Sequence, residues 1–554
     1  MKQKESHIRV LWYRLKWKLG LISGERYRQQ YNKWKFAKDL FEIAGGRVNV
    51  LAHRDYSLIA EEIACVLHIY GYKSDVLYSF GKGADRKAFY IVIMPGMDLK
   101  CLPKRYIAFN VCHAADSFTP QYLAALNGAY GVLDDSQLNI TYLREQEIRP
   151  GFLYYAALAP VLIPVSEYEQ KVTPILIFGD STSPRCKAML EQISKKFSVK
   201  MLNHLVADEK QEELSKAKLV LNIHSCEKSR LEALRICEAL SHGCMVISEA
   251  GENEAVYPHL QEMVEFVAAG DVDSMLERIE YWMTHDEELR RKMETNRHCV
   301  AKVAGRFRMF IARMLLSYNL IDLDAFYEKE HSVFSLGDGK ICISLPESPE
   351  RGEWFDRQNK YGFRFFPGLR HAQGWKGCAM SYKFLARLAL DENRKHVTIC
   401  EDDAELPEDF ADRYAEICQY MEQSDADAFS GFLVEMNDSA NILSVDQSRF
   451  NGKIVQTDTI ISTVFTVYKE KFLRILASWN ERDDNVAMNA IDRYMSRQGK
   501  YKVAFSWPFL VNHCENLFST IWKFQNDFYT ERLTKTKDVI DNKIKEYTSG
   551  TNNQ

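Results

Sequence analysis

The chain has 554 residues, of which 46% are apolar and 27% charged, and its formal net charge is −4. This is more apolar material than one core needs, so we expect three or four folding units. A slightly negative net charge is not typical of nucleic-acid-binding proteins, which are usually basic. The 13 cysteines include no CxxC pair, which argues against a zinc module or a disulfide framework. No apolar stretch could span a bilayer and no signal-peptide pattern opens the chain, so we expect a cytoplasmic protein.

The first 40 residues form a segment of different character, with 11 Lys/Arg, three acids and seven aromatics. Apolar side chains recur at helical spacing on one face: Ile8, Leu11, Trp12, Leu15, Leu19 and Ile22. A basic amphipathic helix of this kind suits an anionic membrane surface, so a peripheral membrane location is one expectation. The alternative is a helix that docks onto its own domain and turns its basic side to water.

From residue 41 to 165 the pattern alternates between apolar strands and helical periodicity. The strand candidates are 47–53, 75–80, 88–96 and 105–113, and helices are expected at 56–72 and 119–129. Near-continuous apolar strands that alternate with helices predict a parallel sheet covered on both faces. We therefore expect a first Rossmann-like domain here.

A second alternating series fills 166–330. Strands are expected at the start of 173–185, in 217–225 and in 244–250, with helices up to about 196 and over 229–242. Two Rossmann-like domains in tandem make a cleft, and ligands bind at the carboxyl ends of such strands.

This pair of domains resembles the GT-B glycosyltransferases. FGDSTSPR (178–185) is similar to the loop that opens their donor-binding domain, and the resemblance places Arg185 near the diphosphate. Glu238 and Gly243, within LNIHSCEKSRLEALRICEALSHGCMVISE (221–249), match the end of the GT-B acidic motif. The earlier acid of that motif falls at Arg230, so the pattern is broken.

Three further polar residues are candidates for the N-terminal donor site: His224, Glu232 and Glu249. The alternative for the two acids is a surface salt bridge and a helix cap. Such a site needs no metal, because a helix N-terminus and basic side chains can hold a diphosphate. His113 and Asp116 are candidates for the acceptor side of the cleft.

A new series of strand and helix patterns begins near 334–340. We therefore expect a third domain over 338–530, followed by a polar tail, 531–554, that is frayed. Within it, the strand HVTIC ends in Glu401, Asp402 and Asp403. Adjacent carboxylates repel one another and offer hard oxygen ligands to Mg²⁺ or Mn²⁺. The alternative is a solvated acidic cap of the helix that follows.

Residues 340–525 resemble glycosyltransferase family 25, the lipooligosaccharide and procollagen galactosyltransferase type. The resemblance rests on ordered blocks: SLPESPERGEWF with Arg351, KGCAMSYKFL (376–385), TICEDDAEL, AIDRYM and NLFSTI (516–521). Tyr382 stands where the family has a histidine.

The resemblance implies a GT-A-like fold, metal dependence and inverting transfer from a nucleotide sugar, with a UDP-sugar as the expected donor. It implies metal ligation by Asp403, with Asp402 beside it. His513, which ends the last apolar strand, is a candidate third ligand, and the alternative is a structural histidine. Asp492 is the expected general base, with a helix cap as its alternative. Donor contacts are expected from Glu401, Asp402, Arg351, Ser381 and Ser519.

The fold class expected is α/β, with a GT-B-like pair of Rossmann domains followed by a GT-A-like domain. The function expected is a two-module glycosyltransferase acting on a glycan or glycolipid acceptor in lipooligosaccharide or capsule biosynthesis. One alternative keeps only the C-terminal enzyme and makes the N-terminal half a module that binds acceptor or membrane. A glycoside hydrolase with paired carboxylates is a third hypothesis.

Removal of residues 1–24 tests the membrane interpretation. The full chain is expected to bind anionic vesicles and to be released by salt, since the attraction is partly screened charge. Vesicle co-sedimentation of both forms at low and high salt measures this. Unchanged binding after the deletion would make the segment merely structural.

Overall fold

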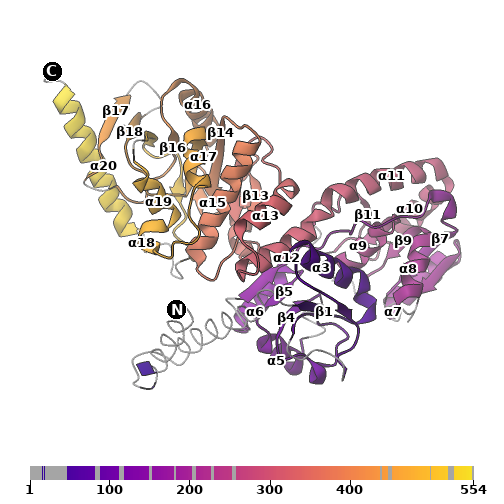
Figure 1. Cartoon of the computed structure of the whole chain (residues 1–554). Coiled ribbons are helices and arrows are strands. Elements are labelled where there is room, and N and C mark those ends of the chain that lie inside the picture. Colours follow the sequence, from indigo (N-terminus) through magenta and orange to yellow (C-terminus); the bar gives the residue numbers. More distant parts are fainter. Residues whose placement is uncertain are drawn as a thin grey trace. The chain divides into compact units, whose positions relative to one another are not determined.

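The structure of this chain is a computed structural model that divides into two compact units, Met1–Ala312 and Arg313–Gln554 (Figure 1). It describes residues 15, 16, 18, 47–81, 88–111, 118–148, 152–179, 183–202, 207–225, 230–251, 257–436, 439–446, 452–499, 501–521 and 530–551.

The first sheet is six-stranded, in the order β2-β1-β3-β4-β5-β6, and every neighbouring pair is parallel. Its strands are β1 (Val48–Leu51), β2 (Val76–Leu77), β3 (Phe89–Ile93), β4 (Tyr106–Asn110), β5 (Val132–Asp134) and β6 (Leu153–Tyr155). The connecting helices are α3 (Ser57–Ile69), α5 (Pro120–Gly128) and α6 (Gln137–Glu145). All positions of β1, β3, β4, β5 and β6 are buried, as in a sheet covered on both faces.

The second sheet is five-stranded and also parallel, in the order β11-β10-β9-β7-β8. Its strands are β7 (Thr173–Phe178), β8 (Val199–Leu202), β9 (Ala217–Asn222), β10 (Met245–Glu249) and β11 (Val264–Val267). The helices of this part are α7 (Pro184–Ser194), α8 (Ala207–Lys216), α9 (Ala233–Ser241), α10 (Val272–Thr284), α11 (Asp286–Val303) and α12 (Gly305–Ser317). A core cluster joins the sheet to α7, α10 and α11. The predicted pair of Rossmann-like domains is confirmed at the level of sheet topology.

The C-terminal unit is built on a mixed eight-stranded sheet, in the order β13-β12-β14-β19-β16-β20-β18-β17. Its strands are β12 (Lys340–Ser344), β13 (Arg364–Pro367), β14 (His396–Glu401), β16 (Ala428–Ser430), β17 (Ile442–Asp446), β18 (Lys453–Thr457), β19 (Phe465–Lys469) and β20 (Val503–Trp507). A two-stranded sheet pairs β15 (Ala404–Glu405) with β21 (Asn512–His513). The helices are α13 (Leu323–Glu330), α14 (Pro349–Asp356), α15 (Gly374–Asp391), α16 (Phe410–Gln423), α17 (Glu470–Ala477), α18 (Val486–Asn489), α19 (Ile491–Arg497) and α20 (Thr530–Thr551).

The boundary between the two units differs from the sequence-based one, because it falls inside α12 and not near 334–340. Arg313, which is 1% exposed, explains the difference. Its guanidinium donates to both oxygens of Glu347 at 2.6 and 2.8 Å and to the carbonyl of Gly368 at 2.8 Å. A buried bidentate pair of this kind fixes the end of α12 to the C-terminal unit.

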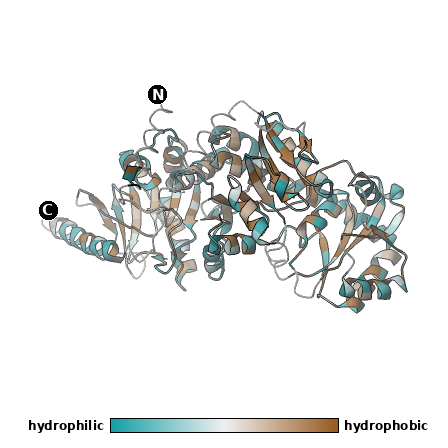
Figure 2. Cartoon of the chain, turned by 90° about the horizontal axis from the view of Figure 1, so that it is seen from below, coloured by the Kyte–Doolittle hydropathy of each residue, from teal (hydrophilic) through white to brown (hydrophobic). Residues whose placement is uncertain are grey.

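The expected frayed tail is instead the helix α20, which appears in yellow in Figure 1. It is mostly hydrophilic, as the teal colouring of Figure 2 shows, yet Ile540 and Ile544 are buried. Lys543 donates to the carbonyl of Ala440 at 2.8 Å, and Thr536 donates to that of Val434 at 3.0 Å. The polar composition of this segment led to the prediction of a frayed tail, because only a narrow stripe of the helix is apolar and buried.

Within the described part of the chain, none of the helices combines the length and the apolar character needed to cross a membrane. The predicted amphipathic helix at 8–22 lies outside the described residues, apart from 15, 16 and 18.

Candidate active sites

The N-terminal candidate site lies at the carboxyl ends of β7, β9 and β10. His224 follows β9 by two residues, Glu249 is the last residue of β10, and α7 and α9 both begin at this edge. Parallel strands bring their carboxyl ends together, so residues that are far apart in sequence meet here.

Arg185, in the first turn of α7, is partly exposed and forms an ion pair with the buried Glu249. Glu249 also accepts from the backbone N–H groups of His224 at 2.7 Å and Gly270 at 2.6 Å. Burial alone raises the pKa of Glu249, but the bonds from Arg185, Gly270 and His224 outweigh it and hold the pKa below its ordinary value. Arg185 further donates to the carbonyl of His224 at 2.7 Å. The guanidinium expected at the diphosphate is thus engaged by the protein.

His224 is the centre of a second set of contacts, and it is fully buried. Its Nδ1 hydrogen-bonds the carboxylate of Glu232, which is the N-cap residue of α9. Asn222 donates to the same carboxylate at 3.1 Å and accepts from Arg235 at 3.1 Å. His224 Nε2 is buried and has no hydrogen-bond partner among the described residues. A buried polar atom in this state points to a ligand or water that completes the site.

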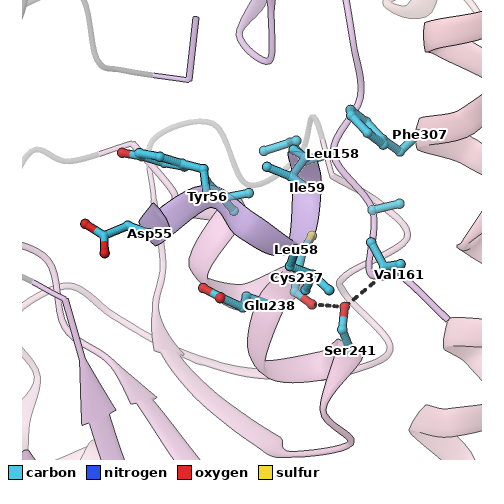
Figure 3. A pocket seen from close by; sticks show the side chains of 12 residues that line it. Asp55, Tyr56, Leu58, Ile59, Leu158, Val161, Cys237, Glu238, Ser241 and Phe307 are labelled. Atoms are coloured by element: carbon cyan, nitrogen blue, oxygen red, sulfur yellow. Dashed lines mark hydrogen bonds between the residues drawn. The ribbon is translucent and has the colours of Figure 1, made fainter. Parts of the chain in front are cut away.

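Glu238 does not contact the residues of this group, and its expected contact with the donor stays a prediction. Its carboxylate pairs with Lys210 at 2.7 Å and accepts from Gln211 at 2.8 Å. It lines a separate cavity with Asp55 and Tyr56 of the first domain (Figure 3). The physical reason is helical geometry: six residues after Glu232, the side chain leaves α9 on another face.

Arg230, which interrupts the acidic motif, reaches into the first domain. Its guanidinium donates to Asn139 at 2.7 Å, and its charge acts on the buried carboxylates of Asp134 and Asp135. Burial raises the pKa of Asp135 to about 6, and Arg230 opposes that shift. A carboxylate at position 230 would face two others, which explains why this chain carries a cation there.

His113 and Asp116, the candidates for the acceptor side, lie outside the described residues.

The C-terminal candidate site surrounds the acids at the end of β14, and Arg351 of α14 holds two of them. Its Nε donates to Asp402 at 2.7 Å and its Nη2 to Asp403 at 2.9 Å. Ser344, the last residue of β12, donates to the second oxygen of Asp402 at 2.7 Å. Arg351 is 6% exposed, so this contact offsets the repulsion between two carboxylates away from water.

Glu401 and His513 complete the inner wall of this site. His513 Nε2 lies 3.5 Å from the carboxylate of Asp403. Burial raises the pKa of Asp403, but Arg351 and His513 together hold it well below its ordinary value. Burial and the charge of Asp403 raise the pKa of Glu401 to about 7. Tyr382, at the position where the resemblance to family 25 would have a histidine, donates to the carbonyl of Thr463 at 2.8 Å, and its hydroxyl oxygen lies 3.4 Å from the carboxylate of Glu401.

The other predicted residues of this site are only partly gathered here. Ser381 is fully buried, accepts from the N–H of Leu369 at 2.7 Å and donates to the carbonyl of Gly377 at 2.9 Å. Its hydroxyl therefore fixes the loop before α15, and its predicted donor contact stays a prediction. Ser519 is buried next to Phe518, whose carbonyl accepts from Arg351 at 3.1 Å.

Asp492 lies in the first turn of α19 and accepts from the N–H of Arg493 at 2.8 Å. Burial raises its pKa, and its charge acts on the thiol of Cys378, which also contacts Glu401 at 3.8 Å. Asp492 is thus in the neighbourhood of the acid cluster. Its role as the general base stays a prediction.

The predicted three-ligand metal set of Asp402, Asp403 and His513 is not formed. The described residues contain no group of three His, Cys, Asp or Glu side chains arranged to hold a metal ion. The reason is that Arg351 and Ser344 take both oxygens of Asp402. Asp403 and His513 still face one another, and a carboxylate with an imidazole suits Mn²⁺ or Mg²⁺ when phosphates and waters supply the remaining ligands. The side chains of Asp403 and His513 therefore fit a metal site to which the protein supplies two ligands.

Several residues of these sites were missed from the sequence. Arg235 and Asn222 form part of the N-terminal network, and Asp134 with Asp135 faces Arg230. The two aspartates carried a usable signal, since they end an apolar run as the acids of β14 do.

One family model matches the sequence: residues 167–305 match the family described as "Glycosyl transferase-like". This segment contains the second sheet and the His224 network. The search of curated proteins found no match.

Three solved structures illustrate the likeness to known folds. Sucrose-phosphate synthase from Thermosynechococcus elongatus is 11% identical, with 49% of this chain and 98% of that chain covered and a TM-score of 0.35. WaaG, a glycosyltransferase involved in lipopolysaccharide biosynthesis, is 11% identical, with 49% and 98% covered and a TM-score of 0.31. TarM is 12% identical, with 44% and 55% covered and a TM-score of 0.31. At these TM-scores the likenesses carry no argument.

The family match assigns a glycosyltransferase-like domain to the chain, in agreement with the enzyme class expected from the sequence. The resemblance of 340–525 to family 25 and its GT-A-like fold stay predictions.

Glu249→Gln tests the N-terminal network. Loss of the buried charge is expected to lower the free energy of unfolding at pH 7 by about 1–3 kcal/mol. Because the folded pKa of Glu249 is depressed, its stabilisation is present above the unfolded value and is lost as pH falls through the folded pKa. The difference from wild type should therefore shrink toward pH 3.5 in urea denaturation. Glu262→Gln, at an exposed position, is the control; equal stability of the Glu249 variant at pH 7 would contradict the account.

Arg351→Met tests the charge balance of the C-terminal cluster. It leaves Asp402 and Asp403 buried without their guanidinium, which is expected to cost about 3–5 kcal/mol. Thermal and urea unfolding of the full chain measure the loss. Arg357 is exposed and lies six residues later, so Arg357→Met should leave the free energy of unfolding nearly unchanged. A melting curve like that of wild type for Arg351→Met would refute the pairing.

Proposed function

We propose that this chain is a two-module glycosyltransferase that transfers sugars from nucleotide-sugar donors to a glycan acceptor in lipooligosaccharide or capsule biosynthesis. The observation that carries the proposal is the buried, incompletely partnered His224 between the starts of α7 and α9, within the segment that matches the glycosyltransferase-like family. The C-terminal acid cluster supports a second site of different chemistry.

In the N-terminal module the diphosphate of the donor lies at His224. The imidazole is held by Glu232 through Nδ1, and in the imidazolium form Nε2–H donates to a phosphate oxygen. The side chain of the N-cap residue of α9 makes no capping hydrogen bond, so the positive end of this nine-residue helix supports the same anion. Arg185 and Glu249 act as positioning residues that fix the backbone of His224 from both sides.

In the C-terminal module Asp492 takes the proton of the acceptor hydroxyl as it attacks the anomeric carbon of the donor sugar, which inverts the configuration there. Arg351 keeps Asp402 and Asp403 in place. Asp403 and His513 are the residues that would hold Mn²⁺ or Mg²⁺, which when bound neutralises charge on the departing nucleoside diphosphate. Glu401 accepts a hydrogen bond from a donor hydroxyl.

The second candidate function keeps only the C-terminal enzyme, with the N-terminal half as a binding module for acceptor or membrane. The contact of Arg230 with Asn139 favours it, since the cation replaces an acid of the GT-B motif.

Counting the sugars added by single-site variants of the full chain separates the two functions. Wild type is assayed against a panel of nucleotide sugars and glycan acceptors, and products are weighed by mass spectrometry. Two additions are expected, of which Asp403→Asn or EDTA stops one and His224→Ala stops the other. His298→Ala, at an exposed helical position, is the matched control for the second variant.

An unchanged sugar count in His224→Ala would leave the N-terminal half as a binding module. Full C-terminal transfer in EDTA would overturn the metal assignment. Hydrolysis of a glycan without any nucleotide sugar would replace both functions by the hydrolase hypothesis.

A further inference from the structure

Phe518 carries the most exposed aromatic ring among the described side chains. The residue is 47% exposed, whereas the next residue, Ser519, is buried. Large apolar side chains are usually withdrawn from water, and this one lies in the segment between β21 and α20. Exposure alone decides nothing, because single apolar residues on a surface are common. What distinguishes Phe518 is how its backbone is held.

The segment that carries Phe518 is tied to the acid cluster at three points. At its start, His513 faces Asp403 at 3.5 Å and Cys514 donates its N–H to the carbonyl of Asp403 at 2.9 Å. The carbonyl of Phe518 itself accepts from Arg351 Nη1 at 3.1 Å. The guanidinium that holds Asp402 and Asp403 therefore also fixes the position from which this ring projects.

The segment then passes the start of α15. A Cβ added to Gly374, the first residue of that helix, would come within 3.3 Å of the Cα of Ile521. The segment is thus held at the acid cluster through the carbonyl of Phe518 and, three residues later at Ile521, against the first turn of an 18-residue helix. An exposed ring on a fixed backbone loses little conformational entropy when a ligand covers it.

We propose that Phe518 is the platform on which a pyranose ring of the acceptor glycan stacks in the C-terminal site. The apolar C–H face of a pyranose matches the face of a phenyl ring, and its hydroxyls remain available to polar partners. The inference deepens the proposed function and rests on it. Phe518 would contact the acceptor directly and select sugars that present such a face.

An acceptor sugar fits this position better than the base of the donor. A glycan that is being extended must continue into solvent, so its platform has to stay open on one side, as Phe518 is. In the proposed function the donor diphosphate lies at the other end of the same segment, where His513 and Asp403 face one another.

Saturation-transfer NMR on the full chain with Mg²⁺ tests the assignment. Every sample carries His224→Ala, so that only the C-terminal site binds UDP, and wild type here means that chain with Phe518 intact. The probes are methyl α- and β-pyranosides of glucose, galactose, mannose and N-acetylglucosamine, and separately UDP. Wild type should give ring-proton signals for at least one pyranoside and base signals for UDP. Phe518→Ala should lose the pyranoside signal and keep the UDP signal, whereas Phe518→Tyr should keep both.

A matched control is Phe365→Ala, which removes the other exposed phenyl ring of the same unit, on β13. It should leave both signals unchanged. In transfer assays, Phe518→Ala should raise KM for the acceptor about 3- to 10-fold with kcat and the donor KM unchanged, the scale of one aromatic contact.

Three outcomes would overturn the assignment: pyranoside signals that survive Phe518→Ala, loss of the UDP signal in that variant, or no pyranoside bound by wild type. In the second case the ring would carry the donor base. Absence of UDP binding at wild type would instead count against the proposed function, so the two failures can be told apart.

Discussion

The guanidinium of Arg351 sets the geometry of the C-terminal site, because two adjacent carboxylates cannot be buried without a counter-charge. It contacts Asp402 and Asp403 and, through a third bond, the carbonyl of Phe518. One side chain on α14 thereby positions the acids at the end of β14 and the segment after β21. The site depends on this contact more than on any single strand.

In the N-terminal site, too, a buried carboxylate is paired with a guanidinium. Arg185 and Glu249 neutralise one another at the edge of the second sheet and fix the backbone of His224 between them. The charged groups that the sequence suggested as ligand contacts hold one another and the backbone of His224, and the imidazole of His224 is the group to which we assign the ligand contact. Arg230 likewise supplies a positive charge to the buried Asp134 and Asp135, which belong to the other Rossmann-like domain.

Much of the fold could be predicted because buried parallel strands read as continuous apolar runs, and β1, β3, β4, β9 and β14 lie where such runs stand. The order of the mixed eight-stranded sheet could not, since pairing of β16 between β19 and β20 leaves no local signal. Of the site residues, those at strand ends and those in the first turns of α7 and α14 lie at the two candidate sites, whereas Glu238 and Ser381, farther along their helices, have other partners. Glu238 and Ser381 show why: the face of a helix on which a side chain lies depends on partners distant in sequence, here Lys210 and Leu369.

The central claim is that one chain holds two independent nucleotide-sugar sites, and the number of nucleoside diphosphates bound per chain tests it most directly. Isothermal titration of the full chain with UDP and with GDP, in the presence of Mg²⁺, gives that number. The account predicts two sites in total, one lost in Asp403→Asn and the other in His224→Ala. A single site in wild type, or two sites that both disappear in Asp403→Asn, would contradict it.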